Sequence, residues 1–198
     1  MDKGTDTINY SNKLHKMQHI WWKKLLNVQI PYRWNIRRLN LGFVLDVGCG
    51  IGRNLLHING NGVGVDHNPH SIEICKAKGL RAYTSENFTK SEYAKSETFD
   101  TLLLSHVIEH MTKEENIKLI TDYLKYIKSN GRIVIITPQI AGYKADSTHI
   151  WFADFKKIEN VCKELNLIVE KKYSFPLPEF AGAFFRYNEY VVINKKTK

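Results

Sequence analysis

The sequence predicts an α/β fold of three layers, in which a mostly parallel sheet lies between helices and the last strand runs antiparallel. The first observation is that short apolar runs typical of strands alternate with helical patterns from Phe43 onward. Such alternation builds crossover units, which give parallel strands with helices on both faces. The second observation is that residues 167–175 and 189–194 are both strand-like, with no helix between them. Strands joined in this way pair antiparallel, so the sheet gains a mixed edge.

Each element follows from its own periodicity. The predicted strands are apolar runs of a length typical of buried strands, and the helices carry apolar residues at helical spacing. At the N-terminus, residues 11–27 predict an amphipathic helix that Pro31 ends, and a long loop runs from Pro138 to Ile150. The remaining predicted strands cover residues 43–47, 62–66, 80–83, 99–105 and 132–137, and the helices cover residues 54–58, 69–78, 113–128 and 155–165.

Length and charge favour one domain with basic ends. A chain of 198 residues with 43% hydrophobic residues can bury a sizeable core. The net charge is +9, and the basic excess lies in residues 1–45 and in the lysines at the C-terminus. Clustered cations attract phosphate, so a nucleic-acid partner is one interpretation, although a solubilising lysine-rich surface is favoured.

The compartment is expected to be the cytoplasm. No apolar run approaches the roughly 20 residues that span a bilayer, and the first residues lack the basic-then-apolar order of a signal peptide. Cys49, Cys75 and Cys162 are far apart and form no C-x-x-C pair, so neither a disulfide framework nor a zinc finger is predicted. We therefore expect no membrane association, and the sequence makes no prediction of oligomeric state.

A glycine loop follows the first predicted strand. Asp46 precedes Gly48, Gly50 and Gly52, which lie where the strand turns into a helix. Glycines there let the backbone turn sharply and let a ligand touch it. The acid before the loop would repel a pyrophosphate but favour a cation. Asp66 ends the second strand, where a carboxylate can accept hydrogen bonds from ribose hydroxyls. Together these features predict a site for a positively charged nucleoside.

From about Leu41 to Asn194 the chain resembles the class I methyltransferases that use S-adenosylmethionine (SAM). The glycine loop, the acid of the second strand, the fourth-strand segment 99–110 and the fifth-strand segment 131–138 occur in the family's order. The resemblance implies a Rossmann-like, seven-stranded sheet and SAM as cofactor, with S-adenosylhomocysteine (SAH) as product. It also implies a lid or extension over residues 1–40 and a methyltransferase domain over residues 41–198.

The same resemblance implies the residues that bind the cofactor. The glycines of the loop would line its methionine and ribose, Asp66 its ribose, and His67 its adenosine. Glu86, after the third strand, would contact the adenine, and the backbone at Ser105 and His106 would receive the methionine amino group. The implied cofactor-binding set is Asp46, Gly48, Cys49, Gly50, Gly52, Asp66, His67, Glu86, Ser105 and His106.

Histidines and an acid gather after the fourth strand. His106, Glu109 and His110 have spacings that place them on one face of a helical turn, and His149 follows in a later loop. In one use, His149 is the general base for an acceptor hydroxyl, with Glu109 and His110 beside it. In the other use, which is not favoured, all four residues hold a divalent metal. Related metal-dependent families carry an acid where this chain has His106.

The long loop and the N-terminal segment are expected to bind the acceptor. Tyr143 and Trp151 would supply apolar walls, although Trp151 fits a core position equally well, and Arg33 would hold an anionic group. The predicted activity is O-methylation of a small-molecule or glycan hydroxyl. An RNA methyltransferase and a SAM-binding protein without catalysis are the alternatives. The fourth strand lacks the Asn/Asp-Pro-Pro-aromatic signature of base N-methylation, since Ser105 to Ile108 stand there.

Overall fold

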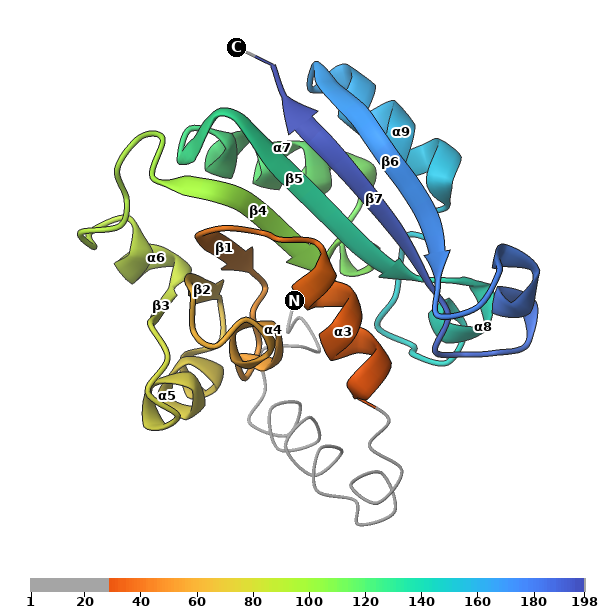
Figure 1. The fold of residues 1–198 in the computed structure, drawn as a ribbon, viewed down its shortest axis with the longest axis horizontal. Helices are drawn as coiled ribbons and strands as arrows, with labels where there is room; N and C mark the ends of the chain where they lie inside the picture. The colour runs from red at the N-terminus through yellow and green to blue at the C-terminus, as the bar shows by residue number, and fades with distance from the viewer. Residues whose placement is uncertain (1–28, 198) are drawn as a thin grey trace.

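The computed structural model describes residues 29–197, which form one seven-stranded sheet covered by helices on both faces (Figure 1). The strand order is β3-β2-β1-β4-β5-β7-β6. The first five strands are parallel, whereas β7 runs antiparallel to both β5 and β6. The predicted three-layer fold and its antiparallel last strand are confirmed. The predicted helix over residues 11–27 lies outside the described residues.

The strands have the bounds β1 Val44–Val47, β2 Gly62–Asp66, β3 Ala82–Thr84, β4 Phe99–Ser105, β5 Ile127–Pro138, β6 Leu167–Phe175 and β7 Glu189–Lys196. The helices are α3 Ile30–Arg38, α4 Arg53–His57, α5 Pro69–Ala77, α6 Ser85–Phe88, α7 Lys113–Leu124, α8 Ile140–Tyr143 and α9 Phe155–Glu164. Two short 3-10 turns, η1 Ile108–His110 and η2 Glu179–Ala183, complete the described part of the chain. None of its helices is long and apolar enough to cross a membrane.

Local sequence sets where the main helices begin. Asn68 caps α5 by accepting from the backbone of His70 at 3.0 Å, with Pro69 in the first turn. Thr112 and Glu115 form a reciprocal capping box at the start of α7. Asp154 caps α9 by accepting from the Lys157 amide at 2.9 Å. These caps satisfy backbone donors that would otherwise have no partner in the first turn.

Three boundaries differ from the sequence prediction. Pro31 lies in the first turn of α3 and begins a helix there, because its missing N–H is not needed at that position. The helix predicted to reach residue 128 ends at Leu124, since Ile127 is buried and pairs with Phe99 as the first residue of β5. The loop after β5 contains the short helix α8.

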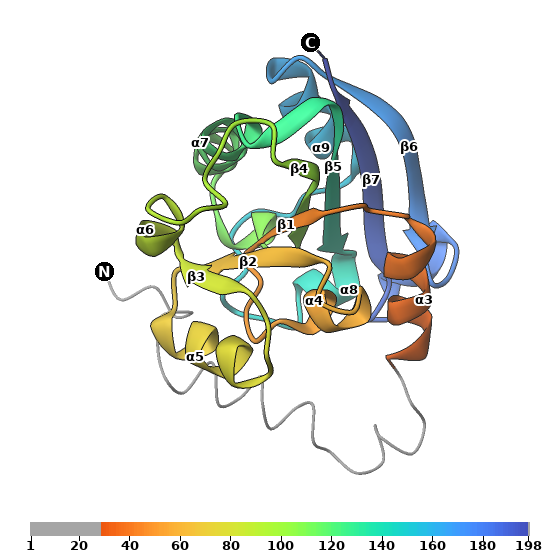
Figure 2. The ribbon, with the colours of Figure 1, turned by 60° about the vertical axis from the view of Figure 1, so that its left-hand side comes forward.

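The sheet is buried on both faces. On β5, Ile133 and Ile135 face a core cluster that includes Ile120 of α7 and Ile158 of α9. Val134 and its alternating neighbours face the second cluster, which includes Ile36 of α3 and Leu39, the residue that follows α3. Figures 1 and 2 show α3 on one side of the strands and α7 and α9 on the other. Because β1, β2, β4 and β5 all end at one edge, the loops that follow them meet there.

Candidate functional site

The glycine loop after β1 adopts a conformation that side chains disfavour. Gly48, Gly50 and Gly52 have φ angles of 74°, 52° and 79°, in the left-handed region. A Cβ on Gly48 would lie 2.4 Å from Cγ2 of Val107, which follows β4. The backbone of the loop therefore approaches the exit of β4 too closely for a side chain at this position.

Asp46 is a buried carboxylate at the end of β1, below the loop. It is 1% exposed, and neither of its oxygens has a hydrogen-bond partner within residues 29–197. Burial, together with the neighbouring Asp66 carboxylate, raises the pKa of Asp46 to about 7, while the Asn54 side chain opposes the shift. A buried acid without a partner costs free energy unless a ligand supplies donors or positive charge.

Asp66, at the end of β2, ties the loop to its neighbouring strand. Its Oδ2 accepts a hydrogen bond from the amide of Gly50 at 2.8 Å, and its Oδ1 accepts one from Asn68 at 2.9 Å. His67 lies beside it, with Nδ1 3.6 Å from Asp66 Oδ1, and its side chain is half exposed. Each carboxylate oxygen can accept a further hydrogen bond, so these contacts leave capacity for a ligand hydroxyl.

The structure places Cys49 and Glu86 differently from the other residues proposed to bind the cofactor. Cys49 is buried and turned away from the loop's open side, against Gly64 of β2, so only its backbone faces the strand ends. Glu86 projects from α6 into solvent, where it accepts from Lys90 Nζ at 2.9 Å, which lowers its pKa. A contact between Glu86 and adenine stays a prediction.

His106 follows Ser105 at the exit of β4 and has a positive φ of 58°. Its Nε2 lies 2.8 Å from Glu189 Oε1, and its Nδ1 lies 3.3 Å from Glu109 Oε1. Loss of hydration disfavours the imidazolium, although the side chain is still 43% exposed, but the hydrogen bonds to the two carboxylates outweigh it and raise the pKa of His106 to about 10. The ring is therefore a cation at neutral pH.

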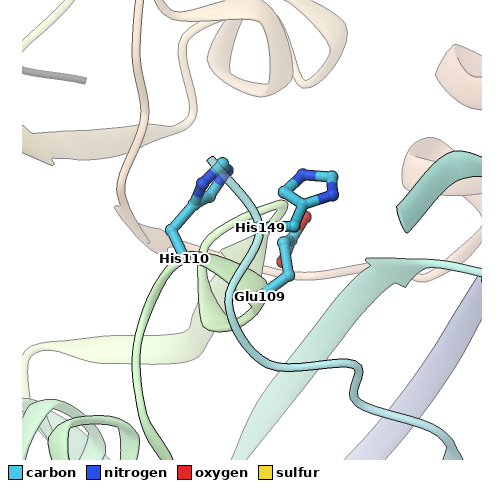
Figure 3. Close-up of side chains that lie close together, drawn as sticks. All are labelled: Glu109, His110 and His149. Atoms are coloured by element: carbon cyan, nitrogen blue, oxygen red, sulfur yellow. The ribbon is translucent and has the colours of Figure 1, made fainter. Parts of the chain in front are cut away.

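Glu109, His110 and His149 come together, and Figure 3 shows their side chains close to one another. Each offers one ligand atom, and these atoms all lie within 4.8 Å of one another. The His110 and His149 rings contact edge to face at a centroid distance of 4.7 Å. Glu109 is completely buried; burial raises its pKa, but His106 outweighs that effect and lowers it. The structure thus brings three of the four predicted residues into one cluster, whereas His106 spans Glu109 and Glu189.

The histidines of this cluster are oriented by main-chain carbonyls. His149 Nδ1 lies 2.8 Å from the carbonyl oxygen of Tyr143. His110 Nδ1 lies 3.3 Å from the carbonyl of Thr148 and 3.1 Å from its hydroxyl. Because a carbonyl only accepts, Nδ1 of His149 carries a proton, and in the neutral ring the lone pair is then on Nε2. Burial lowers the pKa of His110, which favours its neutral form.

The residues predicted to bind the acceptor lie in three different settings. The Tyr143 ring is half-buried and stacks on His149 at 5.5 Å. Trp151 packs against the larger core cluster, and its backbone amide donates to Glu109 at 3.1 Å. Arg33 is exposed on α3. Tyr143 is therefore the one of the three whose ring stacks on a histidine of the cluster.

Three residues that line a cavity at the strand ends, Arg53, His57 and Glu189, were missed in the sequence. A small cavity, which we name the α3–α4 cavity, has a volume of about 40 Å³ and is lined by Tyr32, Arg53, His57 and Glu189, together with Ser105 and His106. Arg53 and His57 belong to the short helix α4, and Glu189 begins the last strand. Nothing local distinguishes these residues, because their shared cavity arises only when α3 packs across the strand ends.

A family model described as a methyltransferase domain matches residues 45–135, from β1 to β5. The match contains the glycine loop, the β2 acid and the β4 exit described above. Within these residues the chain is similar to class I SAM-dependent methyltransferases.

Solved methyltransferases share the fold. A TehB-like SAM-dependent methyltransferase from Corynebacterium glutamicum has a TM-score of 0.67 at 17% identity, with 97% of this chain and 100% of that chain covered. A SAM-dependent methyltransferase from Archaeoglobus fulgidus has a TM-score of 0.65 at 20% identity, with 83% and 93% covered. At these identities the likeness establishes the fold alone.

Among curated proteins, a ubiquinone biosynthesis O-methyltransferase from Rickettsia bellii is 29% identical over 154 residues. The alignment covers 65% of this chain and 61% of the relative, so the chain spans about three fifths of the length of the curated relatives it matches.

The residues present fit SAM. The carboxylate of Asp46, which lacks a partner within residues 29–197, lies below a glycine loop whose backbone is open to a ligand, and it suits the ammonium or sulfonium of SAM. Asp66 has remaining acceptor capacity for ribose hydroxyls. Asp46, Asp66 and the loop backbone are thus the groups of this chain that would hold the cofactor.

Proposed function

We propose that the protein methylates a hydroxyl oxygen of a small molecule or glycan. When bound, SAM supplies a methyl group on a sulfonium, which is a good leaving group. The demands on the protein are to position the acceptor and to remove its hydroxyl proton. The similarity to a curated O-methyltransferase supports oxygen as the acceptor atom.

The observation that carries this proposal is the orientation of His149. Its Nδ1–H donates to the Tyr143 carbonyl at 2.8 Å, which leaves Nε2 as an acceptor on the side of the cluster. A neutral imidazole with a free Nε2 is the form that a general base requires near neutral pH. The stacked Tyr143 ring limits rotation of the imidazole. His149 would therefore take the hydroxyl proton of the acceptor.

Glu109 and His110 would position this base. Glu109 is buried and forms an ion pair with His106, which keeps its carboxylate ionised. This carboxylate places a fixed negative charge near both histidine rings. That charge stabilises the imidazolium formed when His149 accepts a proton. His110 packs against His149 edge to face and restricts where the ring can move.

The acceptor would enter beneath α3. Within the proposed lid of residues 1–40, α3 is the described part, and its Tyr32 lines the α3–α4 cavity together with Ser105 and His106 of the β4 exit. The Tyr32 hydroxyl donates to the Tyr187 carbonyl at 2.6 Å, which holds α3 against the connection between β6 and β7. We therefore assign α3 the role of covering the acceptor.

The test combines cofactor binding with methyl transfer. Calorimetry should show SAH binding, and labelled SAM should transfer its methyl group to the small-molecule or glycan fraction of a cell extract. His149→Ala should lower kcat by about 10²-fold or more and leave the SAH affinity within about twofold. His70→Ala, a matched change on α5, should leave both unchanged. Label in RNA alone, or SAH binding without any transfer, would contradict the proposal.

A divalent metal is the second candidate, favoured by the convergence of Glu109, His110 and His149. Under the general-base proposal, dialysis against a chelator leaves turnover unchanged. If turnover is lost and a divalent cation restores it, the metal replaces His149 as the means of activating the hydroxyl.

A further inference from the structure

A second cavity lies at the edge of the sheet opposite the cofactor loop. This cavity, which we name the β5–β7 cavity, has a volume of about 260 Å³ and is lined by Asp100 of β4, residues 128–132 of β5, Glu170 of β6 and Lys195 of β7. Figures 1 and 2 show the end of β7 and the start of β6 at the edge away from α8. Lys195 and Glu189 lie near opposite ends of β7, roughly 20 Å apart at about 3.3 Å per residue. The cavity is therefore separate from the site where methyl transfer would occur.

Two cations lie directly opposite each other in this cavity. Arg132 of β5 and Lys195 of β7 are partners in the antiparallel pairing, so their side chains leave the same face of the sheet. The Arg132 guanidinium donates to the Leu39 carbonyl at 2.9 Å and to the Asn40 carbonyl, which orient the group without neutralising its charge. The Lys195 ammonium has neither a hydrogen bond nor an ion pair within residues 29–197. Like charges at opposite positions destabilise a sheet, so this pair favours an anion beside it.

The acids of the cavity compensate only part of this charge. Asp100 accepts a hydrogen bond from Lys128 Nζ at 2.7 Å, so the charges of these two residues largely cancel. Glu170 lies at the register shift of β6 and forms no ion pair with another residue of the described part of the chain. Arg132 and Lys195 thus present two positive charges against the single carboxylate of Glu170.

A phosphate group fits this arrangement. A phosphate monoester carries a charge of about −1.5 to −2 near neutral pH, which matches the two cations. The Arg132 guanidinium suits the planar, forked recognition of phosphate oxygens, and Lys195 supplies a point charge. Asn130 also lines the cavity and offers further N–H donors. The volume of about 260 Å³ is many times the roughly 10–15 Å³ that one water needs, so a phosphate with a small organic group has room.

We propose that the β5–β7 cavity binds the phosphate group of a small molecule between Arg132 and Lys195, at a site distinct from the one for methyl transfer. Binding offsets the repulsion between β5 and β7, so the phosphate compound stabilises the folded chain. Glu170 weakens the binding of a bare anion, because its carboxylate repels the phosphate oxygens. The inference is independent of the atom that the protein methylates.

The test is a calorimetric titration with phenyl phosphate at constant ionic strength, with and without saturating SAH. Phenyl phosphate should bind equally well in both cases. Lys195→Gln should weaken its binding about tenfold or more, because a charge-assisted hydrogen bond is lost, whereas Lys195→Arg should retain most of the affinity. Glu170→Gln should tighten binding, since it removes the repelling carboxylate. Lys156→Gln, which removes the same charge from an exposed position of α9, should leave binding unchanged.

Stability gives a second readout. Without phenyl phosphate and at low salt, Lys195→Gln should raise the urea concentration at the midpoint of unfolding, because the repulsion between Lys195 and Arg132 is relieved. Phenyl phosphate should raise the thermal midpoint of the wild type and leave that of Lys195→Gln nearly unchanged. These changes would be absent if Lys195 were an ordinary solvated lysine.

Three results would overturn the inference. If phenyl phosphate does not bind, or binds Lys195→Gln as tightly as the wild type, the β5–β7 cavity is not a phosphate site. If saturating SAH prevents phenyl phosphate from binding, the phosphate occupies the cofactor edge instead. If a ten-nucleotide RNA binds more tightly than phenyl phosphate and loses that affinity in Lys195→Gln, the cavity serves a nucleic-acid backbone and not a small molecule.

Discussion

The imidazole of His106 and the carboxylate of Glu189 form an ion pair of 2.8 Å that joins the exit of β4 to the start of β7. The two residues are 83 positions apart in the sequence. Their contact depends on the antiparallel insertion of β7 between β5 and β6, which pairs Glu189 with Pro138 at the end of β5. The antiparallel edge of the sheet therefore contributes directly to the site.

This pair predicts a pH dependence of stability. The pKa of His106 is raised from 6.5 to about 10 in the folded protein, so protonation favours folding. The contribution of the protonated His106 to the free energy of unfolding is fully present below about pH 6.5 and is lost as the pH rises through about 10. Glu189→Gln should lower the pKa of His106 and flatten this decline, as measured by urea unfolding across that range. Glu114→Gln is the exposed control, and an unchanged decline in Glu189→Gln would contradict the assignment.

Asp46→Asn should separate stability from cofactor binding. Because burial raises the pKa of Asp46 to about 7, its ionisation opposes folding, and this cost appears as the pH rises from about 4 through 7. The variant without cofactor should therefore be more stable than the wild type at about pH 8. Its SAH affinity should fall about tenfold or more, in line with a lost hydrogen bond to a charged group.

Calorimetry and thermal unfolding check both parts of that prediction. Asp122→Asn, an exposed change on α7, is its control. A variant that binds SAH normally would show that Asp46 does not contact the cofactor.

Gly48→Ala should lower both the free energy of unfolding and the affinity for the cofactor. The new methyl would meet Val107 at 2.4 Å, in addition to the strain of a φ of 74°. Gly79→Ala is a close control, since Gly79 has a φ of 73° and nothing within 4 Å of the added Cβ. Gly79→Ala should lower the free energy of unfolding by about 1–2 kcal/mol from backbone strain alone. Gly48→Ala should lower it by more. Urea unfolding should also show that Val107→Ala recovers part of the Gly48→Ala loss and none of the Gly79→Ala loss.

Asn188→Ala should destabilise the connection between β6 and β7. The buried Asn188 amide donates to Gln139 Oε1 at 3.1 Å and to Ser174 Oγ at 2.9 Å, and its Oδ1 accepts from the Leu177 amide at 2.9 Å. Removing it leaves buried polar groups without partners, at a cost of about 2–4 kcal/mol. The free energy of unfolding from urea titration checks this, with the exposed Asn87→Ala as control. If the free energy of unfolding falls by less than about 0.5 kcal/mol, water has replaced the Asn188 amide.

Much of the fold could be predicted because its signals are local. The alternation of strands and helices, the glycines after β1 and the acid at Asp66 all lie within short segments of the chain. Boundaries were less accurate where tertiary pairing competed with periodicity. The helix predicted through residue 128 ends at Leu124, since pairing of Ile127 with Phe99 extends β5 backward.

By itself, the sequence determined the layered sheet, the cofactor loop and the grouping of Glu109 and His110 with His149 as a candidate cluster. Only the tertiary structure decided that His106 lies between Glu109 and Glu189, and that His57 lines a cavity with residues of α3 and the β4 exit. The physical reason is that secondary structure follows the spacing of neighbouring residues, whereas charge and burial at a site depend on which distant strands and helices pack together.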